Sequence, residues 1–382
     1  MYEQDAYASA IRDLGKKYHI HEVGLADYVD GVPLPEDVFR FLREANVFDN
    51  LAPNERGTGV KSVSKWLVAL REVGALDNTS VHIMTTQSMP IYTLQLAGES
   101  DRMSRQLQEM LRLEKTVCFC MTEASGGSDA AGMTTSAVRT DGGYRINGEK
   151  CMIMNAGFAD YFLIVARLSD REGYDGITLF WAERGTPGLE VLPHMQTCGV
   201  TGVPINRVVF RDMFLPAESV VGGEGNGWKI VMSVLNRTRP GVGAAALGEA
   251  RTAMERAAVY GKDRICFGKP LNKNATLQGK FAEMTLAWES AWLLVERAGR
   301  YLDEGAAGQT AISAMAKIAG TDAAKLVIDK ALDFFGGYGY LTEVGMERMY
   351  RDVRTTPIYD GTNDILRGLV AGSQLKSCVE HA

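Results

Sequence analysis

The sequence predicts an α+β protein in which helices and strands occupy separate parts of the chain. Apolar residues recur every three or four positions from about residue 3 to 115, which is the spacing of amphipathic helices. They alternate from about 116 to 215, as in strands, and return to the helical spacing after about 226. We therefore expect three domains, covering residues 1–115, 116–225 and 226–382.

The first part carries the helical pattern in three stretches. These are EDVFRFLREANVF from Glu36, SVSKWLVALREVGA from Ser62 and SDRMSRQLQEMLRL from Ser100. Each of them places apolar side chains on one face of a helix. We expect an N-terminal α-helical domain here.

The central part contains several expected strands. In GGYRINGEKCMIM, from Gly142, the residues alternate, and Asn147-Gly148 is a dipeptide typical of the tight turn of a β-hairpin. The sequence therefore predicts a hairpin that turns at these two residues. The other predicted strands are YFLIVARL, GITLFWAE, LEVLP and NRVVFRDMFLP.

The last part returns to helices that are rich in Ala and Gly. Such residues permit close approach of helices in a bundle. The predicted helical stretches are AALGEARTAMERAAVYG, GKFAEMTLAWESAWLLVERAGRYLDEG, AISAMAKIAGTDAAKLVIDKALDFFGG and DILRGLVAGSQL.

The amino-acid composition argues against several kinds of binding partner and site. Of the 382 residues, 46% are hydrophobic and 23% charged, and the net charge of −6 comes without a Lys/Arg tract that would bind nucleic acid. No apolar run approaches the roughly 20 residues of a membrane-spanning helix, so we expect a cytoplasmic protein. The six Cys form no CxxC pair, so neither a zinc site nor a disulfide framework is predicted.

One Gly- and Ser-rich stretch is a candidate binding loop, whereas the common nucleotide-binding and hydrolase motifs are missing. CMTEASGGSDAAG, residues 120–132, combines hydroxyl side chains with glycine N–H groups that could hold a pyrophosphate. An ordinary surface loop would have a similar composition. The stretch needs a second signal to decide between these interpretations.

Two further stretches supply that signal. DFFGGYGYLTEVGMERMYRD begins at Asp333 and YDGTND at Tyr359. Together with the loop at 120–132, and with INGEK, NRTRPG and FGKPL between them, they resemble the acyl-CoA dehydrogenase family of flavoenzymes over nearly the whole chain. The resemblance implies a central β-barrel domain, a C-terminal four-helix bundle and FAD as cofactor.

The resemblance also assigns candidate site residues. Arg264 corresponds to a residue that reaches the FAD of a neighbouring subunit, which implies a homotetramer or homodimer. The implied substrate is an acyl-CoA or acyl-carrier-protein thioester, and an electron-transferring flavoprotein or other acceptor is the implied partner. The implied FAD contacts are Phe119, Met121, Thr122, Ser128, Met152, Met154, Arg264, Phe267, Gly336, Gly337, Thr362 and Asp364, and the implied substrate contacts are Ser128, Asn236, Arg239 and Gly361.

Asp360 falls at the position of the family's catalytic base, which is normally Glu. A carboxylate there would take the α-proton of the thioester while the β-hydride passes to flavin N5. Asp is one methylene shorter, so the backbone or the substrate must differ. Thr238, at the base position of a branched-chain subgroup, cannot act as a base. An Asp that merely caps the last helix is the competing interpretation.

Other departures leave the chemistry open. Met152 and Met154 stand where relatives carry an aromatic residue and a hydroxyl near the flavin, and a thioether cannot donate a hydrogen bond. The leading hypothesis is an FAD-dependent acyl thioester dehydrogenase, and an enoyl thioester reductase would look the same. A flavin oxidase resembling nitroalkane oxidase, which uses Asp, is the second hypothesis, with Arg367 placed to orient Asp360. A catalytically silent scaffold is the third.

Overall fold

The computed structural model describes residues 6–23, 25–52, 61–97 and 101–380 and confirms the α+β class. Residues 3–5 and Ser100, which open two of the predicted helical stretches, lie outside these ranges. Six helices precede the sheet in the described chain. They are α1 (Ala6–Lys17), α2 (Ile20–Val23), α3 (Glu36–Glu44), α4 (Val63–Leu76), α5 (Asn78–Ala97) and α6 (Asp101–Leu111).

Eight strands form the central sheet, in the order β6-β7-β3-β2-β4-β5-β8, with β1 paired to β4. The edges, β6 and β8, are only three and two residues long and are not paired with each other, so the expected barrel is an open sheet. The strands are β1 (Val117–Cys120), β2 (Ser136–Thr140), β3 (Gly143–Met154), β4 (Tyr161–Leu168), β5 (Ile177–Glu183), β6 (Leu189–Val191), β7 (Ile205–Pro216) and β8 (Val220–Val221).

The predicted hairpin turn at Asn147-Gly148 is wrong. Strand β3 runs straight through both residues, and the bulge opposite Asn147 lies in β7, where Arg211 and Asp212 face this single residue. The turn lies earlier, where Thr140 pairs with Gly143 and Gly142 has a φ of 77°. Asp141-Gly142 has the same turn-forming chemistry as Asn-Gly, and β7 pairs along most of β3, which favours a continuous strand.

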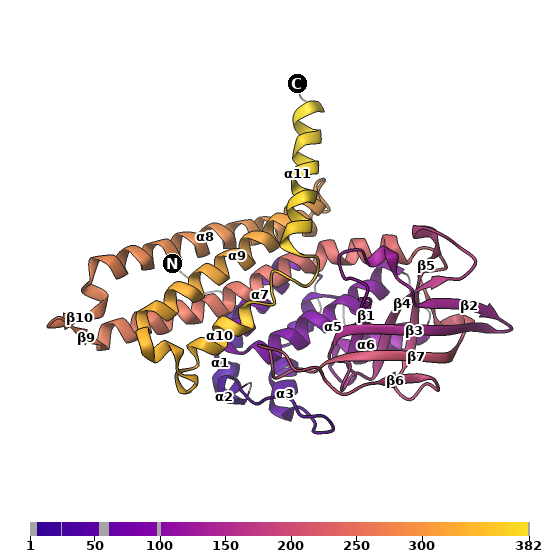
Figure 1. Cartoon of the computed structure of the whole chain (residues 1–382), viewed down its shortest axis with the longest axis horizontal. Coiled ribbons are helices and arrows are strands. Elements are labelled where there is room, and N and C mark those ends of the chain that lie inside the picture. Colours follow the sequence, from indigo (N-terminus) through magenta and orange to yellow (C-terminus); the bar gives the residue numbers. More distant parts are fainter. Residues whose placement is uncertain (1–5, 24, 53–60, 98–100, 381–382) are drawn as a thin grey trace.

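The long helices of the C-terminal part are α7 (Gly227–Asp263), α8 (Ala275–Asp303) and α9 (Gln309–Phe335). They pack side by side, with α4 against α7 and α8 (Figure 1). A Cβ on Gly320 would lie 2.5 Å from the Cα of Gly243, so the close approach expected from the glycine content is confirmed. The remaining elements are β9 (Ile265–Cys266), β10 (Lys269–Pro270), α10 (Met346–Val353) and α11 (Asn363–Glu380).

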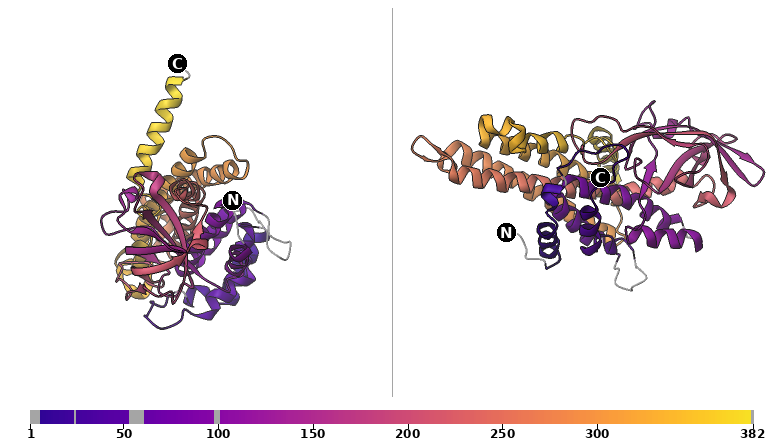
Figure 2. Two further views of the ribbon diagram at one scale, coloured as in Figure 1. Left: turned by 90° about the vertical axis from the view of Figure 1, so that its right-hand side faces the viewer. Right: turned by 90° about the horizontal axis from the view of Figure 1, so that it is seen from below.

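Two hydrophobic cores meet at the sheet. Strand β4 turns Phe162 and Ile164 into the sheet's own core, and Leu163 and Val165 into the large core that the N-terminal and C-terminal helices share. The sheet is therefore fixed against the helices. Helix α11 instead projects from the body, as two views show (Figures 1 and 2). Within the described ranges, no helix is long and apolar enough to cross a membrane.

Candidate active site

Asp360 lies in a short loop between α10 and α11. Asp360 and Gly361 have φ angles of 57° and 91°, so the backbone turns through the left-handed region just before α11 begins at Asn363. Thr362 caps that helix, because its hydroxyl accepts a hydrogen bond from the N–H of Ile365 at 3.3 Å. The capping role that the sequence allowed for Asp360 therefore belongs to Thr362.

The carboxylate of Asp360 is partly buried against α7. The hydroxyl of Thr238 donates a hydrogen bond to its Oδ2 at 3.3 Å, so the two positions that the resemblance implies as alternative bases are in direct contact. Arg367 does not orient this carboxylate, contrary to the expectation from its spacing. Its guanidinium pairs with Asp322 and Asp364, each at 2.6 Å, because α11 begins only after Asp360.

Two buried cations hold the loop by its backbone. Arg239 Nε donates to the carbonyl oxygen of Asp360 at 3.1 Å, and Lys317 Nζ donates to the carbonyl oxygen of Gly361 at 3.0 Å. Arg239 is 6% exposed and Lys317 0%. Neither forms an ion pair with the carboxylate in the described structure. The site thus keeps two positive charges near Asp360 while their hydrogen bonds go to successive carbonyl groups.

The electrostatics of this site suit a proton acceptor. Burial raises the pKa of Asp360 above its ordinary value, although the charges of Arg239 and Lys317 and the Thr238 hydrogen bond act to lower it. Burial also lowers the pKa of Lys317 to about 8, so that its ammonium is still mostly protonated at neutral pH. A carboxylate with a raised pKa is a better general base than an exposed one.

The structure brings the predicted substrate residues of the C-terminal part together around Asp360. Arg239 Nη1 donates to Asn236 Oδ1 at 3.1 Å, and Asn236 Nδ2 donates to Thr310 Oγ1 at 2.8 Å. Gly361 follows Asp360 in the same loop. Arg239 and Asn236 are therefore held in one hydrogen-bonded arrangement with the loop of the candidate base.

The predicted flavin loop starts in the sheet. Phe119 lies in β1, and Met121, Thr122 and Ser128 follow it. The N–H of Cys151 donates to the carbonyl of Thr122 at 2.9 Å, which fastens the loop to β3. Ser128 is exposed, so its hydroxyl is accessible to a ligand.

A buried ion pair supports this loop. Lys150 Nζ lies 2.8 Å from Glu123 Oε1 and donates to the carbonyl of Met121 at 3.0 Å. Glu123 also accepts hydrogen bonds from the N–H groups of Thr134 and Thr135. Burial acts to raise the pKa of Glu123, but these bonds and the Lys150 charge lower it to about 2. The pair is therefore ionised at neutral pH and fixes the start of the loop.

The two methionines differ in exposure. Met152 has a φ of 55° at the β3 irregularity and is 59% exposed, whereas Met154 is partly buried and packs against the helical core. An exposed, flexible thioether side chain beside the loop can pack on a flat ring. Both positions therefore fit an apolar cofactor surface without supplying a hydrogen bond to it.

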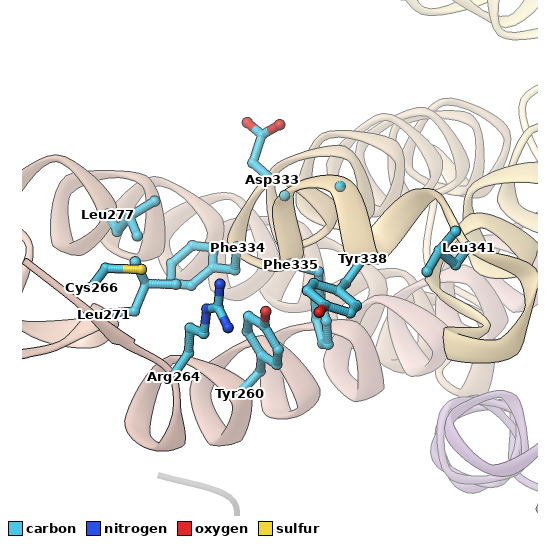
Figure 3. A pocket seen from close by; sticks show the side chains of 12 residues that line it. Tyr260, Arg264, Cys266, Leu271, Leu277, Asp333, Phe334, Phe335, Tyr338 and Leu341 are labelled. Carbon is cyan, nitrogen blue, oxygen red and sulfur yellow. The ribbon is translucent and has the colours of Figure 1, made fainter.

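A second group of predicted cofactor residues lies at the far end of the long helices. Arg264, Gly336 and Gly337 line a pocket of about 430 Å³, together with Tyr260 and Tyr338 (Figure 3). Cβ atoms on the two glycines would meet no heavy atom within 4 Å, so the backbone there is open to a ligand. Phe267, in the turn between β9 and β10, is 96% exposed.

These two groups lie in different parts of the structure. The sheet packs against the first turn of α7, at Gly227, and Arg264 follows its last residue. Helix α7 has 37 residues, which corresponds to about 55 Å. That length exceeds an extended dinucleotide. The residues fit FAD chemically, since they offer hydroxyls, open backbone N–H groups, apolar faces and a cation, but they do so in two separate places.

The last two predicted cofactor residues flank the candidate base. Thr362 is partly buried and caps α11, and Asp364 is exposed in the first turn, where it pairs with Arg367. They lie next to Asp360 in the chain. The loop between α10 and α11 is thus the place where expected cofactor, substrate and base residues adjoin.

Sequence reasoning missed three charged residues of these sites: Glu123, Lys150 and Lys317. Lys150 occupies an inward position of β3, in step with Tyr144 and Ile146, and a Lys in that register signals a buried partner. Lys317 interrupts the Ala-rich buried face of α9. Both patterns were visible in the sequence, but neither indicates which carboxylate or carbonyl is the partner.

Comparison with known proteins identifies the family. The family model for the middle domain of acyl-CoA dehydrogenases matches residues 118–213, and that for their C-terminal domain matches residues 225–375. A short-chain specific acyl-CoA dehydrogenase of Megasphaera elsdenii is 35% identical over 316 residues, 82% of each chain. Acryloyl-CoA reductase (NADH) of Anaerotignum propionicum is 31% identical over 344 residues, 90% of this chain and 87% of its own.

A solved structure agrees with these matches. Butyryl-CoA dehydrogenase from Megasphaera elsdenii superposes with a TM-score of 0.91 and 31% identity, covering 98% of this chain and 99% of that one. The similarity thus includes the N-terminal helices, which neither family model matches. The chain belongs to the acyl-CoA dehydrogenase family of FAD-dependent oxidoreductases, which act on CH–CH groups.

Proposed function

We propose that this enzyme forms an α,β-unsaturated acyl thioester and that Asp360 is the general base. The observation that carries the proposal is the environment of Asp360, a partly buried carboxylate of raised pKa beside two cations that bind the backbone rather than the carboxylate. A direct ion pair would hold the carboxylate and weaken its basicity. This arrangement leaves it able to accept a proton.

The proposed reaction transfers a proton and a hydride. Asp360 accepts the α-proton, and the electron pair of that C–H bond becomes the new α,β double bond as the hydride leaves the β-carbon. Bound FAD supplies the hydride acceptor. Thr238 donates its hydroxyl to one carboxylate oxygen and so restricts the direction in which the other can approach the substrate.

We assign cofactor binding to both groups of residues described above. The loop from Phe119 to Ser128, with Met152 and Met154, would hold the flavin end, and Thr362 and Asp364 would adjoin it. Arg264, Phe267, Gly336 and Gly337 would hold the FAD of another subunit. This division supports a homodimer or homotetramer, because one chain keeps the two groups apart along the length of α7.

The direction of the reaction depends on which electron acceptor or donor exchanges electrons with the flavin. Loss of hydride from the substrate must be balanced by an acceptor, for which we propose an electron-transferring flavoprotein or another protein acceptor. The similarity to acryloyl-CoA reductase favours reduction of an enoyl thioester as the second candidate function. In that direction Asp360 would deliver the α-proton. The titration described next also distinguishes the two possible carriers of the acyl group, CoA and acyl carrier protein.

An anaerobic titration tests the proposal. We expect the purified protein to contain about one FAD per subunit and its flavin absorbance to bleach with at least one acyl-CoA or acyl-carrier-protein thioester. Bleaching by nitroalkanes alone, with peroxide release in air, would instead establish the oxidase. A protein that takes up no FAD would contradict the proposal as a whole.

A further inference from the structure

Lys317 is a buried cation that takes part in neither the proton transfer nor the hydride transfer of the proposed reaction. It belongs to the apolar face of α9, between Ala314 and Gly320, and its side chain is fully buried. Burying an ammonium group is unfavourable unless it is hydrogen-bonded. Its Nζ donates to the carbonyl of Gly361 at 3.0 Å and to Asn363 Oδ1 at 2.9 Å.

Both partners of Lys317 belong to the segment that carries Asp360. Gly361 is the next residue in the loop, and Asn363 is the first residue of α11. Asn363 Nδ2 in turn donates to Thr321 Oγ1 and to Asp322 Oδ1, each at 3.0 Å. Residues 317–322 of α9 are thus joined by four hydrogen bonds to the chain on the C-terminal side of Asp360.

The loop needs such a constraint. Asp360 and Gly361 are both in the left-handed region, which costs free energy for Asp because it carries a Cβ. Arg239 holds the carbonyl of Asp360 from α7, and Lys317 holds the next carbonyl from α9. Two cations, one from each helix, therefore hold the loop that carries Asp360. Replacing either cation would move the Asp360 carboxylate.

We propose that Lys317 is a positioning residue for the reaction: its ammonium group fixes the loop at Gly361 and Asn363 and keeps a positive charge beside Asp360. The proposal rests on the assignment of Asp360 as the base. It goes beyond that assignment. Lys317 binds only a backbone carbonyl oxygen and an amide oxygen, yet we predict that it controls both the position and the pKa of Asp360.

The charged and titratable surroundings of Asp360 are few. Arg239 and Lys317 favour the ionised carboxylate, and Tyr359, whose own pKa is raised by burial, is the adjacent residue. Removing the Lys317 charge leaves Arg239 and the Thr238 hydrogen bond to oppose the effect of burial on the pKa of Asp360. The groups that face the site are Thr238, Arg239 and Glu249 from α7, Lys317 and Asp322 from α9, and Tyr359 and Asn363 from the loop and α11.

Lys317→Met tests both parts of the proposal in the FAD-loaded enzyme, with anaerobic flavin reduction by a reactive acyl thioester measured against pH. Loss of the charge should raise the kinetic pKa for reduction by roughly one unit. Loss of the hydrogen bonds should lower the limiting rate at high pH about 10- to 100-fold. Lys330→Met is the matched control, since Lys330 is on the same helix but pairs with Glu283.

Two further variants separate the charge from the hydrogen bonds. Lys317→Arg retains the charge, so its kinetic pKa should stay within about 0.3 units while its rate falls. Asn363→Ala removes one hydrogen-bond partner of Lys317 but leaves the ammonium in place, and should behave likewise. These variants also decide the question if Lys317→Met does not fold: full rates in both would overturn the proposal.

Protein stability gives a readout that does not depend on turnover. Because burial lowers the folded-state pKa of Lys317 to about 8, the unfolded chain binds more protons between about pH 8 and 10.4. The stability of the parent should therefore rise with pH through that window. Lys317→Met should lack this rise, and Lys330→Met should keep it.

The outcomes distinguish this inference from the proposed function. A folded, FAD-loaded Lys317→Met with the parental pH profile and a rate within twofold of the parent would show that Lys317 only supports the fold. If Asp360→Asn is inactive at the same time, the proposed function stands and the inference fails. If Asp360→Asn reduces its flavin at the parental rate, the assignment of the base fails first.

Discussion

Within the described residues, the buried carboxylate of Glu123 and the partly buried carboxylate of Asp360 each lie near a buried lysine. The two arrangements differ in what the lysine binds. At the predicted flavin loop, Lys150 binds the carboxylate of Glu123 directly, at 2.8 Å, and the pKa of Glu123 falls to about 2. At the loop before α11, Lys317 binds a carbonyl and an amide oxygen, and the pKa of Asp360 is raised. Both lysines are fully buried.

On the proposed assignment of Asp360 as the base, this difference separates a structural carboxylate from a reactive one. A carboxylate with several donors keeps its charge and its place, but it has little tendency to accept a proton. When the neighbouring cations bind the backbone instead, they fix the position of the carboxylate. They then lower its pKa less than a direct ion pair would. The chain therefore uses the same pair of residue types for two purposes, and the hydrogen-bond partners of the lysine decide which purpose is served.

The largest effect we expect is that of Asp360→Asn on flavin reduction. The amide has nearly the same size but cannot accept the α-proton, so the rate should fall roughly 10²- to 10⁴-fold, with FAD still bound. Stopped-flow absorbance with a reactive thioester measures this. Asp37→Asn is the control, because the Asp37 side chain is half exposed on the outer face of α3, and this variant should reduce its flavin at the parental rate. Rapid flavin reduction in Asp360→Asn would show that Asp360 is not the base. The contrast between a structural Glu123 and a reactive Asp360 would then be wrong.

Lys150→Met should have the largest effect on stability. It leaves Glu123 ionised and buried without its cation, which costs about 3 kcal/mol or more in such pairs. Urea unfolding should show this loss, and the double variant Glu123→Gln/Lys150→Met should recover part of it because no charge is then left unpaired. A double variant as unstable as the single one would mean that Lys150 acts through the Met121 carbonyl.

The sequence predicted the class of the fold because hydrophobic periodicity reports it locally. The change of period near residues 116 and 226 agrees with the start of β1 at Val117 and of α7 at Gly227. The hairpin turn was misplaced by six residues because two dipeptides, Asp141-Gly142 and Asn147-Gly148, satisfy the same local rule. Only pairing with β7, which is distant in the sequence, decides between them.

The candidate site was predicted through resemblance, which supplies positions but not partners. The resemblance assigned Asp360 as the base and Arg239 as a substrate contact, and both assignments stay predictions. The hydrogen bond from Arg239 to the Asp360 carbonyl spans 121 residues and has no local signal in the sequence. Arg367 was expected to orient Asp360 because a spacing of seven residues puts two side chains on one face of a helix. Helix α11 begins only at Asn363, and Arg367 pairs with Asp322 instead. Side-chain partners across such separations depend on packing of α7, α9 and α11, which periodicity does not encode.

Asp360→Glu should have a smaller effect than Asp360→Asn. The extra methylene keeps the carboxylate but displaces it from Thr238 Oγ1, now 3.3 Å from Oδ2, and crowds a substrate that suits the shorter base. We expect reduction by the best thioester substrate to slow about tenfold. A faster Asp360→Glu on simple straight-chain acyl-CoAs would mean that the pocket is that of a Glu enzyme and that Asp360 is merely tolerated.

The smallest expected effect is on the pH dependence of stability, where the two carboxylates should have opposite signs. The pKa of Glu123 is lower in the folded state than in the unfolded chain, so its contribution is present above about pH 4.3 and is lost as the pH falls towards 2. Glu123→Gln should lower the melting temperature at pH 7 and do so less at pH 4 or below. For Asp360 the folded-state pKa is raised, so the folded protein binds the extra proton and is relatively most stable below about pH 3.9.

That stability is lost as the pH rises through the folded-state pKa of Asp360, because the ionised carboxylate is then buried at a cost. Asp360→Asn removes the cost, so at pH 7 it should raise the melting temperature by about 1 to 3 °C, and the gain should shrink at low pH. Calorimetric scans of both variants from about pH 2.5 to 8 cover both titrations and measure the two slopes. If Asp360→Asn lowers the melting temperature at pH 7, the charge of Asp360 is stabilised by Arg239 and Lys317 as firmly as that of Glu123 is by Lys150, and the distinction between a reactive and a structural carboxylate does not hold.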